Sequence, residues 1–152
     1  MPTHADLLVV EDNPDDVLLL KCALEDAGIQ SRVRVARDGE DAIRYLSGTI
    51  GDQNRTEHPP PAVVFLDLNL PRKSGLEVLR WIKTQPALKD LIVVVVTSSN
   101  DDAEFKRCCG LGVNAYLKKP ITPEQLLGPG RSLFKVLTRN VTSLDRELSS
   151  IE

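Results

Sequence analysis

Acidic, hydroxyl and basic side chains that could do chemistry together stand at four places along the chain, each close to the end of a run of apolar residues. These residues are Glu11 and Asp12, Asp67, Thr97, and Lys119. Clustered carboxylates repel one another, and a divalent cation with oxygen ligands, chiefly Mg²⁺, relieves that cost. A carboxylate beside Mg²⁺ and a lysine ammonium can accept a phosphoryl group, while a threonine hydroxyl donates to one of the phosphoryl oxygens.

The composition argues against several other kinds of chemistry. The chain has two histidines and three cysteines, without CxxC spacing. It therefore has few residues that could form a hydrolase triad, a zinc site or a disulfide framework. The 19 Lys and Arg against 22 Asp and Glu give a net charge of −3, which offers no basic footprint for nucleic acid. The longest aliphatic run, residues 91–96, is too short to cross a membrane, and the N-terminus lacks the pattern of a secretory signal. We therefore expect a cytoplasmic protein that binds neither nucleic acid nor membrane.

Five short apolar runs predict the strands that position the chemical groups. Three of them are continuous and rich in β-branched residues, which is typical of parallel strands buried on both faces. The second run alternates polar and apolar side chains, as an edge strand can, and the fifth run suits the other edge. The predicted strands cover residues 6–10, 32–36, 62–66, 91–96 and 113–117.

Amphipathic segments between these runs predict five helices. They cover residues 14–27, 38–46, 74–83, 101–110 and a last segment that begins after Thr122. Alternating strands and helices predict an α/β fold, a flavodoxin-like doubly wound parallel sheet of five strands in the order 2-1-3-4-5. Ligands bind such sheets beyond the carboxyl ends of the strands, where the winding reverses. The four places named above should therefore meet at one edge of the sheet.

Four motifs around these residues resemble the receiver domain of two-component response regulators: VVEDNPDD, FLDLNLPRKSGLEVL, VVVVTSS and YLKKP. The resemblance covers residues 5–139, which would form the receiver domain. It implies a signalling protein that accepts a phosphoryl group from a sensor histidine kinase on Asp67 in a Mg²⁺-dependent reaction. Such a protein is not an enzyme in the ordinary sense, although it can catalyse its own phosphorylation and dephosphorylation.

The same resemblance implies the metal ligands. Asp12 would bind Mg²⁺ directly, Glu11 would act nearby, commonly through water, and Asp67 and the backbone carbonyl of Asn69 would complete the protein ligands. From the residues alone, Glu11 and Asp12 could instead cap the helix that begins near Pro14, and the two roles can coexist.

The resemblance also implies how the signal would leave the site. Lys119 would pair with the phosphate, Thr97 would be the switch hydroxyl and Tyr116 the switch aromatic, although Tyr116 also fits a half-buried aromatic of an edge strand. Phosphorylation would change the face formed by the fourth helix, the fifth strand and the fifth helix. We expect a homodimer through that face and the C-terminal helix.

The DLNLP string and the long connection over residues 48–61 are also similar to single-domain regulators that partner bacterial and cyanobacterial phytochromes. That similarity implies a light-responsive histidine kinase as the phosphoryl donor. The connection itself and the Gly128-Pro129-Gly130 sequence, which predicts a kink or break in the last helix, have no functional interpretation.

Two other functions compete with this interpretation. The first is a pseudo-receiver, a docking module that never turns over phosphate. The second is an aspartyl phosphatase of the haloacid-dehalogenase type, which needs a second aspartate at position 69, where Asn69 stands. The chain has neither GxGxxG nor GK[ST], so dinucleotide or P-loop binding lacks its phosphate cradle. Asp15 and Asp16 are interpreted as first-turn acids that complement the helix dipole.

We expect residues 140–152 to form a separate tail, which continues a heptad pattern that begins at Phe134. The apolar positions are spaced 3-4-3-4-3 and comprise Phe134, Leu137, Val141, Leu144, Leu148 and Ile151. The spacing predicts an extended C-terminal helix that pairs with a second copy, and the alternative is a helix that folds back or frays. We expect no DNA-binding output domain after residue 139, so output would occur by protein contact.

Overall fold

A computed structural model describes residues 5–50 and 60–127 of the chain. Five parallel strands form one sheet in the order β2-β1-β3-β4-β5, which confirms the predicted flavodoxin-like topology. The strands are β1 (Ala5–Val10), β2 (Ser31–Ala36), β3 (Val63–Asp67), β4 (Ile92–Thr97) and β5 (Ala115–Lys118). The heptad tail and the Gly128-Pro129-Gly130 sequence lie outside the described residues, as does most of the long connection.

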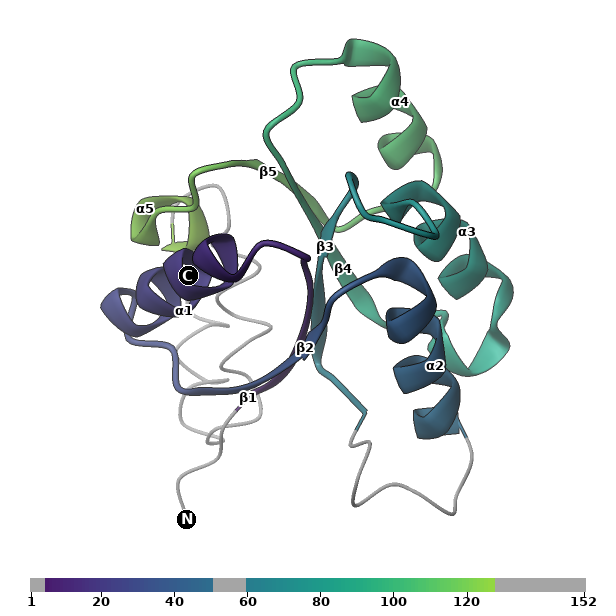
Figure 1. Ribbon diagram of the computed structural model, residues 1–152, viewed down its shortest axis with the longest axis horizontal. Helices are drawn as coiled ribbons and strands as arrows, with labels where there is room; N and C mark the ends of the chain where they lie inside the picture. The colour runs from purple at the N-terminus through teal and green to yellow at the C-terminus, as the bar shows by residue number, and fades with distance from the viewer. Residues whose placement is uncertain (1–4, 51–59, 128–152) are drawn as a thin grey trace, which may run out of the picture.

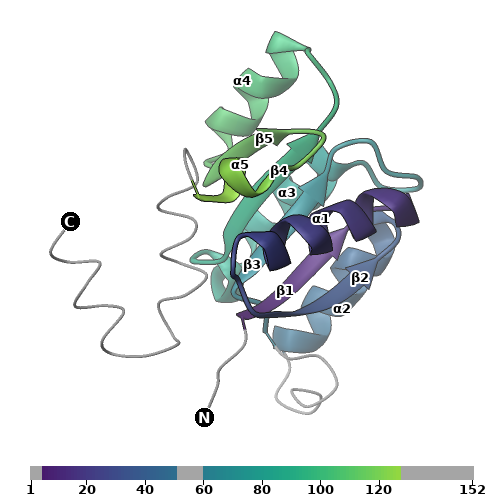
Figure 2. The same ribbon diagram turned by 90° about the vertical axis from the view of Figure 1, so that its left-hand side faces the viewer.

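Helices cover both faces of the sheet. They are α1 (Pro14–Asp26), α2 (Gly39–Ile50), α3 (Gly75–Thr84), α4 (Asp102–Gly110) and α5 (Pro123–Leu127), and a short 3₁₀ helix, η2 (Pro86–Leu88), precedes β4. Figure 1 shows α1 and α5 on one side of the sheet and α2, α3 and α4 on the other, and the rotated view in Figure 2 agrees. Both faces of the central strands are therefore buried.

The continuous apolar strands follow from this burial. Successive side chains of β1 point to opposite faces, so Leu7 and Val9 join the core under α1 and α5, while Leu8 and Val10 join the core under α2 and α3. Every residue of β3 is buried. At the edge, β2 exposes Arg32 and Arg34, as its alternating pattern predicts, and also Val35, which the alternation places on the apolar face.

Local sequence signals fix the helix ends. The side chain of Asn13 accepts a hydrogen bond from Asp15 N at 2.9 Å and caps α1, and Asp101 caps α4 by accepting from Ala103 N at 3.0 Å. After α1 the chain turns at Gly28, whose φ is +77°. Within the described residues, no helix is long and apolar enough to cross a membrane.

Two predicted boundaries are wrong by more than one residue. Residues 48–50 were expected in the long connection but belong to α2, because the buried Thr49 hydroxyl donates to the Leu46 carbonyl at 2.7 Å and is satisfied inside the helix. β5 was expected from residue 113 but begins at Ala115. There the Asn114 side chain accepts from Val93 N at 2.8 Å and takes the place of a backbone partner.

Candidate functional site

The carboxyl ends of the strands bring the predicted site residues to one edge of the sheet. Register pairs Asp67 with Val96 and Thr97 with Lys118, so the ends of β3, β4 and β5 lie level with one another. Glu11 follows β1 directly and its backbone N–H donates to the Ala36 carbonyl at 2.9 Å, which continues the pairing with β2. Parallel topology alone therefore places these ends together, as the sequence predicts.

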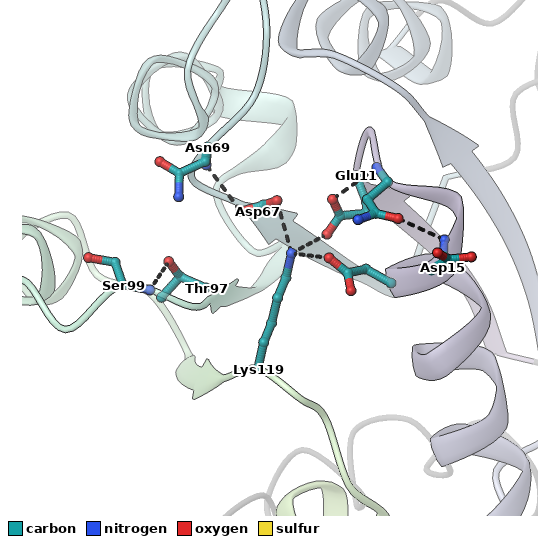
Figure 3. Close-up of polar contacts among 9 residues, drawn as sticks. Glu11, Asp15, Asp67, Asn69, Thr97, Ser99 and Lys119 are labelled. Carbon is teal, nitrogen blue, oxygen red and sulfur yellow. Dashed lines mark hydrogen bonds and ion pairs between the residues drawn. The ribbon is translucent and has the colours of Figure 1, made fainter.

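Lys119 lies at the centre of the site. Its Nζ lies 2.7 Å from Glu11 Oε1, 2.8 Å from Asp16 Oδ2 and 3.1 Å from Asp67 Oδ2. Figure 3 shows the lysine side chain reaching between Glu11 and Asp67, with Thr97 on the side away from Glu11. Burial lowers the pKa of Lys119, but the hydrogen bonds to Asp16 and Glu11 outweigh this and raise the pKa above its ordinary value. The ammonium therefore stays charged.

Asp16 is the site residue that the sequence interpretation missed. It was assigned to the helix dipole, yet its carboxylate forms an ion pair with Lys119. A signal for this position exists in the sequence, because Asp16 lies one helical turn before Leu20 and so stands at the start of the buried stripe of α1. An acid there faces the strand ends rather than solvent.

Glu11 is buried, with an exposed fraction of 5%. Its Oε2 accepts a hydrogen bond from Asn13 N at 3.2 Å, and its Oε1 accepts from Lys119. Burial, with a smaller contribution from the negative charge of Asp67, raises the pKa of Glu11 to about 7, although the hydrogen bond from Lys119 lowers it. The pKa of Glu11 therefore lies close to neutral pH rather than in the usual acidic range.

Glu11, Asp12 and Asp67 form an acidic cluster. One carboxylate oxygen from each of them lies within 4.8 Å of the others, and Asp12 is exposed while the other two are buried. Three carboxylate oxygens at this spacing fit a hard divalent cation such as Mg²⁺, because oxygen ligands are the ones it prefers and its charge offsets their repulsion. The donor chemistry therefore agrees with the predicted metal.

The loop after β3 supports Asp67 from the other side. Asn69 N donates to Asp67 Oδ1 at 3.0 Å, and the binding of a metal by the Asn69 carbonyl stays a prediction. Gly75 N donates to the Leu68 carbonyl at 3.1 Å, so the start of α3 lies against the end of β3. A Cβ atom on Gly75 would lie 2.3 Å from the Asp67 carbonyl oxygen, so this close approach requires glycine.

The same loop is joined to the start of α2. Asp38 caps α2 by accepting from Asp41 N at 2.7 Å, and its other oxygen forms an ion pair with Arg72, a contact that the sequence interpretation did not include. Arg72 has a φ of +66°, which is rare for a residue with a side chain. The hydrogen bond from Asp41, with smaller contributions from Arg72, lowers the pKa of Asp38.

Thr97 is the last residue of β4 and Tyr116 lies on the edge strand β5, as the sequence predicts. Their switch roles stay predictions. Thr97 is fully buried, and its Oγ1 accepts a hydrogen bond from Ser99 N at 3.1 Å. Its carbonyl accepts from Lys119 N at 2.8 Å. Tyr116 is half-buried and packs edge-to-face on Phe105 of α4, with 5.0 Å between ring centroids.

The chain is similar to response regulators both in sequence and in structure. The pattern of the response regulator receiver domain matches residues 7–128. The response regulator Rcp1 of Synechocystis sp. is 39% identical over 114 residues, which cover 74% of this chain and 75% of Rcp1. A structure of Rcp1 in its Mn²⁺-bound form is 34% identical, covers 86% of this chain and 92% of that one, and has a TM-score of 0.70.

Two further solved structures are similar over nearly the whole chain. The bacteriophytochrome response regulator AtBRR is 39% identical with a TM-score of 0.73, and the match covers 93% of this chain and 96% of AtBRR. The phosphorylated cyanobacterial phytochrome response regulator RcpA is 33% identical with a TM-score of 0.73, and the match covers 92% of this chain and 98% of RcpA. All three relatives are response regulators, and two are named for phytochromes.

Proposed function

Because this chain belongs to the response regulator receiver domain family, we propose that it accepts a phosphoryl group from a sensor histidine kinase on Asp67. One observation carries the proposal: the Asp67 carboxylate lies 3.1 Å from the Lys119 ammonium and within the acidic cluster of Glu11 and Asp12. A nucleophilic carboxylate, a fixed cation and a set of metal ligands are the groups that phosphoryl transfer needs.

The transfer uses Asp67 as the nucleophile. A carboxylate oxygen of Asp67 forms a bond to phosphorus while the bond from phosphorus to the histidine nitrogen of the kinase breaks. The electron pair of that bond returns to the imidazole, and Asp67 becomes an acyl phosphate. The Lys119 ammonium neutralises charge on the phosphoryl oxygens, and Thr97 can donate its hydroxyl hydrogen to one of them.

Glu11, Asp12, Asp67 and the Asn69 carbonyl are the residues that would hold Mg²⁺. Bound Mg²⁺ supplies positive charge next to the phosphoryl oxygens. The acidic cluster supports this proposal, as does the Mn²⁺-bound form of the related Rcp1. The hydrogen bond that Asn69 N donates to Asp67 Oδ1 at 3.0 Å orients the nucleophilic carboxylate.

The signal would leave the site through Thr97 and Tyr116. Closure of Thr97 and its loop on the phosphoryl group would let Tyr116 turn inward, and the surface of α4, β5 and α5 would change its binding preferences. Phe105, which packs on Tyr116 and is 45% exposed, supports this proposal because it links the half-buried ring to the surface. We place a homodimer contact on this face, with residues 140–152 as a second contribution.

The phosphoryl donor is proposed to be a phytochrome kinase. The support is the similarity to AtBRR and RcpA over nearly the whole chain. We further propose that residues 5–139 form the receiver domain and that the protein is cytoplasmic and signals by protein association.

The geometry favours this function over its two rivals. A pseudo-receiver needs no functional site. Here, however, the Lys119 ammonium contacts Asp67, which is itself part of the acidic cluster. An aspartyl phosphatase needs a second acid two residues after the nucleophile, and the amide of Asn69 cannot donate a proton as a general acid.

Acetyl phosphate tests the proposal without the kinase. The protein is incubated with acetyl phosphate in the presence and absence of Mg²⁺, and its intact mass is measured. We expect a gain of one phosphoryl group that requires Mg²⁺ and disappears in Asp67→Asn. A gain that persists in Asp67→Asn, or no gain in the wild type, would contradict the proposal.

A further inference from the structure

We propose that Asp16 is a positioning residue that holds the Lys119 ammonium before phosphorylation and competes with the phosphoryl group for it. This inference rests on the proposed function and adds a residue to it. The ion pair crosses from α1 to the residue after β5, so it joins two elements that both flank the site. Removal of the Asp16 carboxylate should therefore strengthen the binding of a phosphoryl group.

All three N–H donors of the Lys119 ammonium have carboxylate partners. A lysine ammonium has three N–H donors, and three carboxylate oxygens lie within hydrogen-bond distance of Nζ. They belong to Glu11, Asp16 and Asp67. A phosphoryl oxygen that pairs with Lys119 must therefore displace one of these three partners.

Asp16 is the partner that can be displaced most easily. Glu11 and Asp67 belong to the acidic cluster that would bind the metal, and both side chains are only 6% exposed. The Asp16 side chain is outside that cluster and 29% exposed, so water can replace the ammonium as its partner. A carboxylate that regains water loses little when its ion pair is broken.

Asp15 provides a matched control. It carries the same charge one residue earlier in the first turn of α1, and it is exposed. Figure 3 shows Asp15 on the far side of the helix start from Lys119. Asp15→Asn therefore removes one negative charge near the site but leaves the ion pair between Asp16 and Lys119 intact.

The experiment measures the binding of beryllofluoride, a phosphoryl analogue, by ¹⁹F NMR at saturating Mg²⁺. Asp16→Asn should bind it about fivefold more tightly than Asp15→Asn, the size expected for loss of a partly exposed ion pair. In a Lys119→Ala background, the difference between Asp16→Asn and Asp15→Asn should vanish, because the competition needs the ammonium. Thermal denaturation verifies that each variant is folded, and Mn²⁺ titration followed by EPR reports its metal affinity separately.

Three results would overturn the inference. They are equal affinities for Asp16→Asn and Asp15→Asn, weaker binding by Asp16→Asn, and a gain that persists without Lys119. If the wild type binds beryllofluoride in each of these cases, the proposed phosphoacceptor role stands and only the role of Asp16 is wrong. If the wild type and all variants fail to bind it, both proposals are wrong.

Discussion

The Lys119 ammonium lies 3.1 Å from Asp67 Oδ2 although β4 separates the strands that lead to these two residues. The lysine side chain therefore spans the end of the strand that carries Thr97. Its ammonium is the positive charge at the centre of the site and has carboxylate oxygens of Glu11, Asp16 and Asp67 as partners.

Removal of the lysine charge should destabilise the metal-free protein. Lys119→Ala leaves the carboxylates of Glu11 and Asp67 buried without their partner, and breaking a buried pair in this way costs about 3 kcal/mol. The free energy of unfolding is measured with urea above the pKa of Glu11. Mg²⁺ should restore part of the loss, because the ion offsets the same charges. The matched control is Lys118→Ala, an exposed neighbour, and a similar loss in that variant would contradict the explanation.

Glu11 should make the stability of the metal-free protein depend on pH. Folding raises the pKa of Glu11 from 4.5 to about 7, so between these values the folded state binds more protons than the unfolded state. The contribution of this group to stability is complete below 4.5 and is lost as the pH rises through about 7. Urea unfolding over this range should show the loss in the wild type and in Glu40→Gln, an exposed control, but not in Glu11→Gln. A parallel pH profile in Glu11→Gln would refute the assignment.

Replacing Arg72 by glycine should lower the free energy of unfolding less than replacing it by alanine. Its φ of +66° costs a residue with a side chain about 1 kcal/mol, and glycine avoids that cost. Both substitutions remove the ion pair with Asp38. The difference in stability between the two variants therefore reports the effect of the backbone conformation alone. Arg72→Gly should therefore unfold at a higher urea concentration than Arg72→Ala. At Lys73, where φ is not positive, glycine should have no such advantage over alanine.

Gly75 should tolerate no side chain. In Gly75→Ala the new Cβ would lie 2.3 Å from the Asp67 carbonyl oxygen and 2.6 Å from Leu68 Cα, so β3 or α3 must shift. We expect a loss of about 2 kcal/mol in the free energy of unfolding and weaker Mn²⁺ binding, because the shift moves the nucleophile. Gly110→Ala, in open space at the end of α4, should leave both quantities nearly unchanged. Normal Mn²⁺ affinity in Gly75→Ala would show that Asp67 does not depend on this contact.

The sequence was sufficient to predict the sheet and the meeting of Asp67, Thr97 and Lys119 at its edge. Continuous apolar runs identify buried parallel strands, and the topology of such sheets brings their carboxyl ends together. The pairs between Asp16 and Lys119 and between Asp38 and Arg72 were not predicted. Each joins side chains of elements far apart in the chain, and their contact depends on side-chain conformations that a periodic pattern does not encode.

If Asp67 is the phosphoacceptor, the phosphoryl group can be located on that residue of the chain. The wild-type protein is phosphorylated with acetyl phosphate and Mg²⁺, the acyl phosphate is reduced with borohydride to a homoserine, and peptide mass spectrometry finds the altered residue. We expect homoserine at position 67 in place of Asp67, and no homoserine when Mg²⁺ is chelated. Reduction at Asp12, Asp16 or another carboxylate, with Asp67 unchanged, would contradict this expectation.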